Sequence, residues 1–229
     1  MGNERKGVLV VLACHCVYDP QTDAIYTDKP QFVNDRPVYE AHLEYAFRHL
    51  HLCINWLPNS DPLLVISGGF TKVQRNCSES RSYVEMARRM DLEIPSNLAL
   101  EEFALTSIEN LLFSLYAFHE AQGAYPAQID VISWAFKRER FEATIKAINE
   151  WEQLGESWES IDFFPVGDLR QEEKKFVKSK IEQSYIDSLA SGLTAYYDNP
   201  ETRDAIARRD VYESRMMAKK RYAKYPLPF

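Results

Sequence analysis

The stretch Leu63-Leu64-Val65-Ile66-Ser67-Gly68-Gly69 decides the fold expected for this chain. Its apolar residues are consecutive, which is typical of a short strand buried on both faces of a parallel sheet. The two glycines that follow let the backbone turn tightly or approach a bound group closely. The Ser78-Glu79-Ser80 segment then begins helix-forming sequence. The pattern predicts a strand, a loop that contacts an anionic ligand, and a helix; a tight turn without a ligand is the alternative.

The same order of strand and helix recurs along the chain. Further apolar runs predict strands over 8–13, 129–133 and 161–166, and a short apolar segment falls within 94–101. Helical spacing predicts helices over 38–50, 78–90, 108–122 and 136–151. Ser78, and then Thr106 or Ser107, are expected helix N-caps, and Gly123 a helix end. Polar sequence with prolines over 19–37 is expected to form a long loop. These elements predict an α/β class with a Rossmann-like, doubly wound and mostly parallel sheet.

The sequence changes character after Asp168. Charged, helix-forming stretches cover 171–189 and 201–222, and the second has few large apolar residues. We therefore expect an α/β domain over 1–168 and a helical appendage over 169–229 that packs on the same domain. The charge runs in the appendage, which include Arg208 and Arg209, are interpreted as solvated helix faces.

Composition narrows the class of protein. The chain has 229 residues, 45% of them hydrophobic, and a formal net charge of −7, which disfavours a broad nucleic-acid or anionic-membrane surface. No apolar run reaches the roughly 20 residues that cross a bilayer, and the first residues do not resemble a cleaved leader, so a cytoplasmic location without membrane contact is expected. The four cysteines lack Cys-x-x-Cys spacing, which predicts reduced thiols. Cys14-His15-Cys16 has no second ligand pair, so no metal site is predicted there.

Three longer motifs reinforce the fold prediction. The first is Val65-Ile66-Ser67-Gly68-Gly69 followed by Ser78-Glu79. The second runs from Glu101 through Thr106-Ser107-Ile108-Glu109-Asn110. The third is Val131-Ile132-Ser133-Trp134-Ala135-Phe136-Lys137-Arg138-Glu139-Arg140, and the opening strand with 36–46 gives a weaker fourth. Together they resemble the DUF218 family, also called YdcF-like, which includes the SanA and ElyC envelope proteins; the resemblance covers roughly residues 8–166.

The resemblance implies a Rossmann-like fold, a ligand site at the strand ends, and S-adenosylmethionine or a nucleotide as a ligand. Lys137 stands where the family usually has His, and Ala104 where a Ser is common. A solvated lysine is a poor base at neutral pH, so Lys137 shifts the expectation from catalysis towards anion binding. The first strand is followed by Cys14-His15-Cys16 and by no Gly-x-Gly-x-x-Gly dinucleotide motif.

The candidate site residues follow from these motifs. Glu109 and Ser67 are the candidate catalytic residues, Glu109 to position a metal or a proton and Ser67 as a nucleophile, although no paired histidine is apparent. Glu79 and Glu109 open helices that follow strands, so both can face one crevice. Lys137 and Arg140 are three residues apart and are predicted to clamp a phosphate or carboxylate, with a surface charge pair as the alternative. The candidate ligand-binding residues are Gly68, Gly69, Ser78, Glu79, Ser107, Asn110, Ser133, Lys137 and Arg140.

Two functions fit these predictions. The first is an enzyme, a hydrolase or transferase, that acts on a small phosphorylated or nucleotide-like substrate. The second is a binding or sensor module that uses the same pocket without catalysis. The partner is a small molecule in both cases, and neither predicts contact with nucleic acid or membrane.

Overall fold

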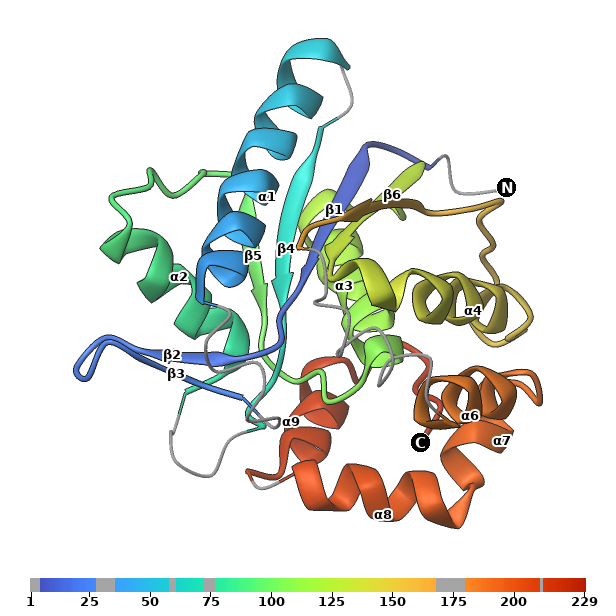
Figure 1. Ribbon diagram of the computed structural model, residues 1–229. Helices are drawn as coiled ribbons and strands as arrows, with labels where there is room; N and C mark the ends of the chain where they lie inside the picture. Colours follow the sequence, from blue (N-terminus) through green and yellow to red (C-terminus); the bar gives the residue numbers. More distant parts are fainter. Residues whose placement is uncertain (1–4, 28–35, 58–60, 72–76, 168–179, 211) are drawn as a thin grey trace.

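The computed structural model describes residues 5–27, 36–57, 61–71, 77–167, 180–210 and 212–229. Its centre is a five-stranded sheet in which each neighbouring pair is parallel (Figure 1). The strands, in the order in which they lie side by side, are β5 (Leu98–Glu101), β4 (Leu63–Ser67), β1 (Val8–Ala13), β6 (Gln128–Ser133) and β7 (Asp162–Pro165). The predicted α/β class is confirmed, and the strand order is that of a doubly wound Rossmann-like sheet.

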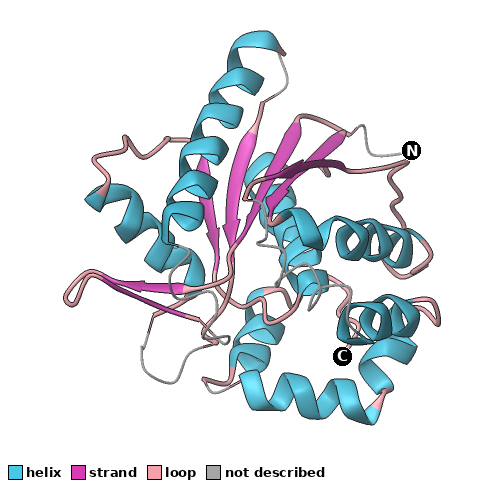
Figure 2. Cartoon of the chain, viewed as in Figure 1, coloured by secondary structure: helices cyan, strands magenta, loops and turns pink. Residues whose placement is uncertain are grey.

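Helices cover both faces of the sheet, as Figure 2 shows. On one face lie α1 (Arg36–Trp56) and α2 (Glu79–Arg89), and on the other α3 (Ser107–Gln122) and α4 (Arg138–Asn149). The side chains of β1 alternate between the two: Val8, Val10 and Leu12 pack towards α1 and α2, and Leu9 and Val11 towards α3 and α4. Because both faces are buried, the strands are apolar throughout, as the sequence indicated.

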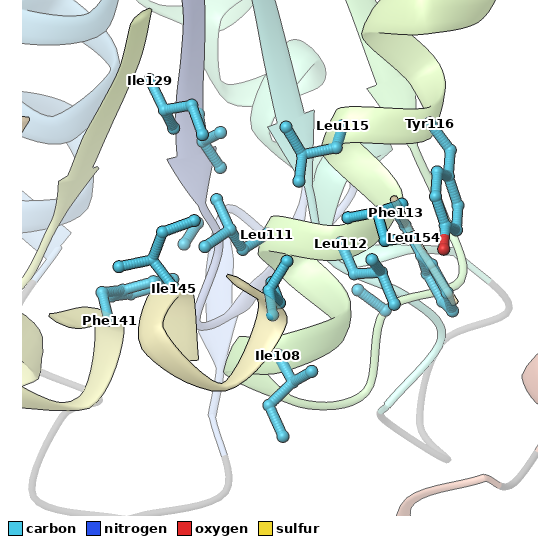
Figure 3. Packing of buried hydrophobic residues seen from close by; sticks show 14 of the residues in the cluster. Ile108, Leu111, Leu112, Phe113, Leu115, Tyr116, Ile129, Phe141, Ile145 and Leu154 are labelled. Atoms are coloured by element: carbon cyan, nitrogen blue, oxygen red, sulfur yellow. The ribbon is translucent and has the colours of Figure 1, made fainter. Parts of the chain in front are cut away.

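The helix α3 supplies much of the larger core. Its apolar residues pack against Ile129 of β6 and against Phe141 and Ile145 of α4 (Figure 3). Thr106 is the N-cap, since its hydroxyl accepts a hydrogen bond from the N–H of Glu109, and Gly123 ends the helix with a φ of 72°. These ends match the predicted ones, with Thr106 and not Ser107 as the cap. Because α3 follows β5, its first turn lies at the carboxyl edge of the sheet.

The loop expected over 19–37 is partly a hairpin. The strands β2 (Val17–Asp19) and β3 (Ala24–Tyr26) pair antiparallel. The Asp19 side chain stabilises the turn by accepting a hydrogen bond from the N–H of Gln21, and Asp23 adopts a φ of 54°. Buried β-forming side chains at Val17 and Ile25 favour extended backbone on both arms. Residues 28–35 lie outside the described part of the chain.

The C-terminal segment forms several short helices. These are α6 (Lys180–Leu189), α7 (Leu193–Asp198), α8 (Pro200–Arg209) and α9 (Ser214–Arg221). The single helix expected over 201–222 was wrong: it is interrupted before Ser214, where Glu213 has a φ of 56°. Large buried side chains, among them Tyr196, Tyr197 and Tyr222, join the core on the α3 and α4 face. Of the expected helix over 171–189, residues 171–179 lie outside the described residues.

The C-terminal helices lie beside the carboxyl ends of the strands, at the lower right of Figure 1. Across the described ranges, the structure contains no helix whose length and apolar character would let it traverse a bilayer.

Candidate functional site

The order of the strands reverses between β1 and β6, and the carboxyl edge of such a switch point is where ligands bind in open α/β sheets. Cys14 and His15 follow β1, and β6 leads through the short helix η2 (Ala135–Lys137). The Nζ atom of Lys137 lies 3.2 Å from Nδ1 of His15. A charged ammonium can only donate, so this contact places the proton of a neutral His15 on Nε2. The motif in 131–140 thus brings Lys137 to the switch point.

A cavity of about 730 Å³ opens at this position. Its buried lining residues from the α/β domain are Cys14, Thr71, Glu79, Ala104, Leu105, Thr106, Ser107, Asn110 and Lys137, with His15 and Arg140 partly exposed. The C-terminal helices and their connections contribute Tyr185, Ser188, Tyr196, Asn199, Glu201, Thr202, Ala205, Ile206, Arg208 and Arg209. The cavity is therefore built jointly by the sheet edge and the C-terminal segment.

The charge of the lining differs in sign from that of the whole chain. Its lysine and arginine residues are Lys137, Arg140, Arg208 and Arg209, against the two carboxylates of Glu79 and Glu201. The chain as a whole carries a formal net charge of −7. The excess of cations inside one cavity of an acidic protein attracts an anionic ligand.

Lys137 is 4% exposed, so the expectation of a solvated lysine was wrong. Lys137 ends η2, where its backbone N–H donates to the carbonyl of Trp134 over 2.9 Å, and the rings of Trp134 and Phe136 lie 6.0 Å apart between centroids. Removing an ammonium from water costs free energy that nearby polar groups or an anion offset. The buried amine of Lys137 is therefore one of the polar groups that line the cavity.

The positive charge of Lys137 acts to lower the pKa values of His42 and Cys14, which lie nearby. Burial, followed by the positive charge of Lys137, lowers the pKa of His42 to about 4, against the opposing effect of hydrogen bonds with the backbone of Val166 and Ser133. Burial and the negative charge of Glu79 raise the pKa of Cys14 well above its usual value, more than Lys137 lowers it. At neutral pH His42 is uncharged and Cys14 is a thiol. Neither is an activated nucleophile or base in this state.

Arg140 and Glu79 are held by neighbouring side chains. The guanidinium of Arg140 lies 4.7 Å from the ring centroid of Tyr185, and its Nη1 donates to the hydroxyl of Ser107 over 3.4 Å. Glu79 accepts a hydrogen bond from the hydroxyl of Thr71. The tyrosine ring and the guanidinium fork together form a surface that suits a planar or phosphorylated group.

Five of the residues predicted from the sequence line this cavity, and six do not. Those in the lining are Glu79, Ser107, Asn110, Lys137 and Arg140. Those outside it are Ser67, Gly68, Gly69, Ser78, Glu109 and Ser133. Lys137 and Arg140 therefore face one cavity, as the clamp hypothesis requires.

The glycine turn is occupied by internal hydrogen bonds. The N–H groups of Gly68 and Gly69 donate to the carbonyls of Glu101 and Ala104, at 3.0 and 2.8 Å. A Cβ atom on Gly68 would lie 2.8 Å from the Cβ atoms of Cys14 and Glu79. Close packing accounts for both glycines, and their N–H groups are already used, which supports the tight-turn alternative.

Ser67 is fully buried beside Glu101. Its hydroxyl lies 2.7 Å from Oε2 of Glu101 and 2.9 Å from Oδ1 of Asn110. Glu101 also accepts a hydrogen bond from the N–H of Phe103, and burial raises the pKa of Glu101 to about 8 despite these bonds. This network fixes the loop that carries Ala104 into the cavity. These hydrogen bonds give Ser67 a positioning role, and no histidine of the described residues pairs with its hydroxyl.

Ser78 and Ser133 also lie away from the cavity. The hydroxyl of Ser78 caps α2 by accepting from the N–H of Arg81, and it donates to Oε1 of Glu102 over 2.8 Å. Within the described residues, the buried hydroxyl of Ser133 has no hydrogen-bond partner.

Glu109 connects α3 to the C-terminal helices. Its Oε2 accepts a hydrogen bond of 2.6 Å from the N–H of Leu105, and its Oε1 accepts from the hydroxyl of Tyr197 at 3.1 Å and from Arg215 at 3.3 Å. Burial raises the pKa of Glu109 although Arg215 and these hydrogen bonds act in the opposite direction. The contacts describe a structural anchor, and the proposed catalytic role of Glu109 gains no support from its position.

The sequence did not reveal the contribution of the C-terminal helices to the cavity. Tyr185 lies in α6, within a stretch that was expected to be helical, whereas Tyr196 lies in α7, which falls between the two expected stretches. Arg208 and Arg209 were interpreted as solvated; they line the cavity, with Arg208 exposed and Arg209 partly exposed. Ile181, Tyr185 and Leu189 recur at helical spacing in the sequence of α6, so this spacing and the tyrosine content were the available signals.

The comparisons with known proteins give a short local similarity. A segment of 45 residues, 20% of this chain, is 42% identical to the uncharacterized protein YOR238W of Saccharomyces cerevisiae. The matched segment spans 15% of the length of that yeast protein. No protein-family model matches the chain, and no solved structure does.

Proposed function

We propose that this protein binds a small anionic or nucleotide-like molecule in the cavity at the carboxyl edge of its sheet. The observation that carries the proposal is the buried cation of Lys137, which lines the cavity with Arg140, Arg208 and Arg209 in a chain of net charge −7. A phosphate or carboxylate would meet both a point charge from lysine and the bidentate fork of arginine.

The aromatic residues of the cavity extend the proposal to the rest of the ligand. Tyr185 and Tyr196 lie in the lining with their ring centroids 5.6 Å apart. A flat ring system packs on such side chains and gains about 1–3 kcal/mol when a base stacks on an aromatic ring. A nucleotide, or S-adenosylmethionine as the DUF218 resemblance implies, combines a ring with a charged group. Membership of the DUF218 family is itself part of this proposal.

The chemistry proposed for the cavity is that of a hydrolase or transferase. His15 and Lys137 place an imidazole and an ammonium in contact at the switch point, where they can orient a ligand and stabilise negative charge. A sensor module that holds the ligand without turnover uses the same contacts, and a turnover measurement distinguishes the two. Four free cysteines, three of them buried, agree with the reducing cytoplasm as the proposed location.

Thermal-shift measurements test the binding proposal. The purified chain is screened against inorganic phosphate, adenine nucleotides, sugar phosphates and S-adenosylmethionine. A ligand at a hundred times its Kd stabilises a protein by about 2.7 kcal/mol, which raises the melting temperature measurably.

Matched variants locate any ligand that is found. Lys137→Met with Arg140→Met removes two cations of the cavity, and Lys146→Met removes an exposed cation of the same helix, α4. The proposal requires that the shift be lost in the double variant and kept in Lys146→Met. A shift that survives in the double variant, or no shift with any of these ligands, contradicts it.

A further inference from the structure

A second group of polar side chains lies under α1, away from the cavity. His49 and Cys53 are one helical turn apart on α1, and Asp130 lies on β6 beneath them. Their ligand atoms all lie within 4.8 Å of one another. The Nε2 atom of His49 is 2.7 Å from Oδ2 of Asp130, and Sγ of Cys53 is 4.0 Å from the same oxygen. Three different ligand types therefore converge on one point between a helix and the sheet.

Neighbouring residues hold these groups in place. Gln128 donates to Oδ1 of Asp130 over 2.8 Å, which leaves Oδ2 directed at His49 and Cys53. The ring of His49 stacks on Tyr45 at 5.9 Å between centroids, with an angle of 11°, and contacts Phe164 at 4.3 Å. Outer contacts of this kind orient metal ligands in known sites.

Burial of the group is uneven. Asp130 is 1% exposed and Cys53 is 5% exposed, while the side chain of His49 retains 12% exposure. Solvent can therefore supply a fourth ligand from the side of the histidine. The group lies on the α1 face of the sheet, whereas the cavity of the proposed function is completed by α3, α4 and the C-terminal helices.

We propose that His49, Cys53 and Asp130 bind one zinc-like divalent ion with water as the fourth ligand. An imidazole nitrogen, a thiolate and a carboxylate oxygen form a donor set that zinc accepts, whereas magnesium and calcium prefer oxygen ligands. On binding, the thiol proton of Cys53 and any proton on the ring of His49 pass to solvent, and no electron is transferred. Small side-chain movements bring the three atoms to coordination distance. The ion would join α1 to β6 and stabilise the fold independently of the ligand cavity.

Without a metal ion, His49 and Asp130 form a partly buried ion pair. Burial lowers the pKa of His49, but the hydrogen bond and the charge of Asp130, with a contribution from Cys53, outweigh it and raise the pKa to about 9. A metal ion must therefore displace the proton of His49 that the ion pair stabilises. The measured affinity for the metal is the difference in free energy between the metal-bound state and this ion pair.

Cobalt titration tests the proposal. The full chain is stripped with a chelator, reduced and titrated with Co²⁺ without oxygen, and then with Zn²⁺ in competition. We expect a sulfur-to-cobalt charge-transfer band in the near ultraviolet, visible bands of a four-coordinate ion, a stoichiometry of one, and loss of all bands on addition of Zn²⁺.

The variants distinguish this site from other thiols. Cys53→Ala is expected to abolish the charge-transfer band, and Cys77→Ala, which changes a partly buried cysteine outside the group, is expected to keep it. Gln128→Met should keep the band and weaken the affinity about 10- to 100-fold, the usual effect of losing an outer contact. Circular dichroism confirms that each variant is folded. A missing band, a band retained in Cys53→Ala, or a band lost in Cys77→Ala overturns the proposal.

Discussion

Replacement of Glu109 by Gln is the perturbation that separates structural anchoring from catalysis most clearly. Glu109 is 1% exposed and accepts hydrogen bonds from Leu105, Tyr197 and Arg215. A glutamine keeps the shape of the side chain but turns one acceptor into a donor and removes the charge opposite Arg215. We predict that α7 and α9 are then held less tightly against α3.

The expected magnitude follows from these contacts. Breaking a fully buried ion pair costs about 3–5 kcal/mol, and each buried group left without a partner costs about 1–3 kcal/mol. The side chain of Arg215 is 22% exposed and can be partly rehydrated, which lowers the contribution of the ion pair. We therefore expect a loss of about 2–4 kcal/mol, or a fall in melting temperature of roughly 4–16 °C for a chain of this size.

Urea denaturation of the wild type and of Glu109→Gln measures this loss, and limited proteolysis reports whether the C-terminal helices are released. Arg215→Met and the double variant complete a cycle in which the two changes should be non-additive, because the side chains are in contact. Glu120→Gln, at another ion pair of α3, is a matched control because its partner Arg221 is exposed. A change below about 1 kcal/mol in Glu109→Gln, with unaltered proteolysis, would refute the anchoring role.

Two further predictions concern the turn and the network behind the cavity. Gly69→Ala should destabilise the fold by about 1–3 kcal/mol, because the new Cβ would lie 2.7 Å from the carbonyl oxygen of Ala104 and the backbone cannot move aside easily. Urea titration measures this loss, and an unchanged midpoint would contradict the close packing. Burial raises the folded-state pKa of Glu101 to about 8, so the stability conferred by its neutral carboxyl is complete below pH ~4.5 and is lost as pH rises through about 8. Relative to Glu101→Gln, the wild type should therefore lose unfolding free energy on the order of 4 kcal/mol between pH 5 and pH 9, and a constant difference over that range would show that Glu101 is ionised throughout.

The sequence predicted the sheet and its helices well because their residues follow simple periodicities. Continuous apolar runs such as 63–66 occur where helices cover both faces of a strand, and Thr106 and Gly123 act locally as helix ends. Asp19 and Asp23, which shape the β2–β3 turn, lie in polar sequence that carries no alternation, so the hairpin was expected as a loop.

The candidate site was predicted less completely, because its geometry depends on contacts between distant segments. Lys137 and Arg140 could be placed together from their spacing, and they do line one cavity. The order of strands and helices placed Glu79 and Glu109 at one crevice, yet Glu109 turns to Tyr197 and Arg215 in the C-terminal segment. The sequence could not predict the group of His49, Cys53 and Asp130 for the same reason. Cys53 and Asp130 are 77 residues apart in the chain and meet only in the folded protein.

We propose above that the cavity at the carboxyl edge of the sheet binds an anion through Lys137 and Arg140. The most direct test is a crystal structure of the protein soaked with tungstate, whose tetrahedral anion mimics phosphate and whose metal gives a strong anomalous signal. We expect an anomalous peak inside the cavity, in contact with Lys137 and Arg140, that disappears in Lys137→Met/Arg140→Met. A cavity without a peak, in crystals where tungstate binds other sites, would rule out anion binding through these two residues.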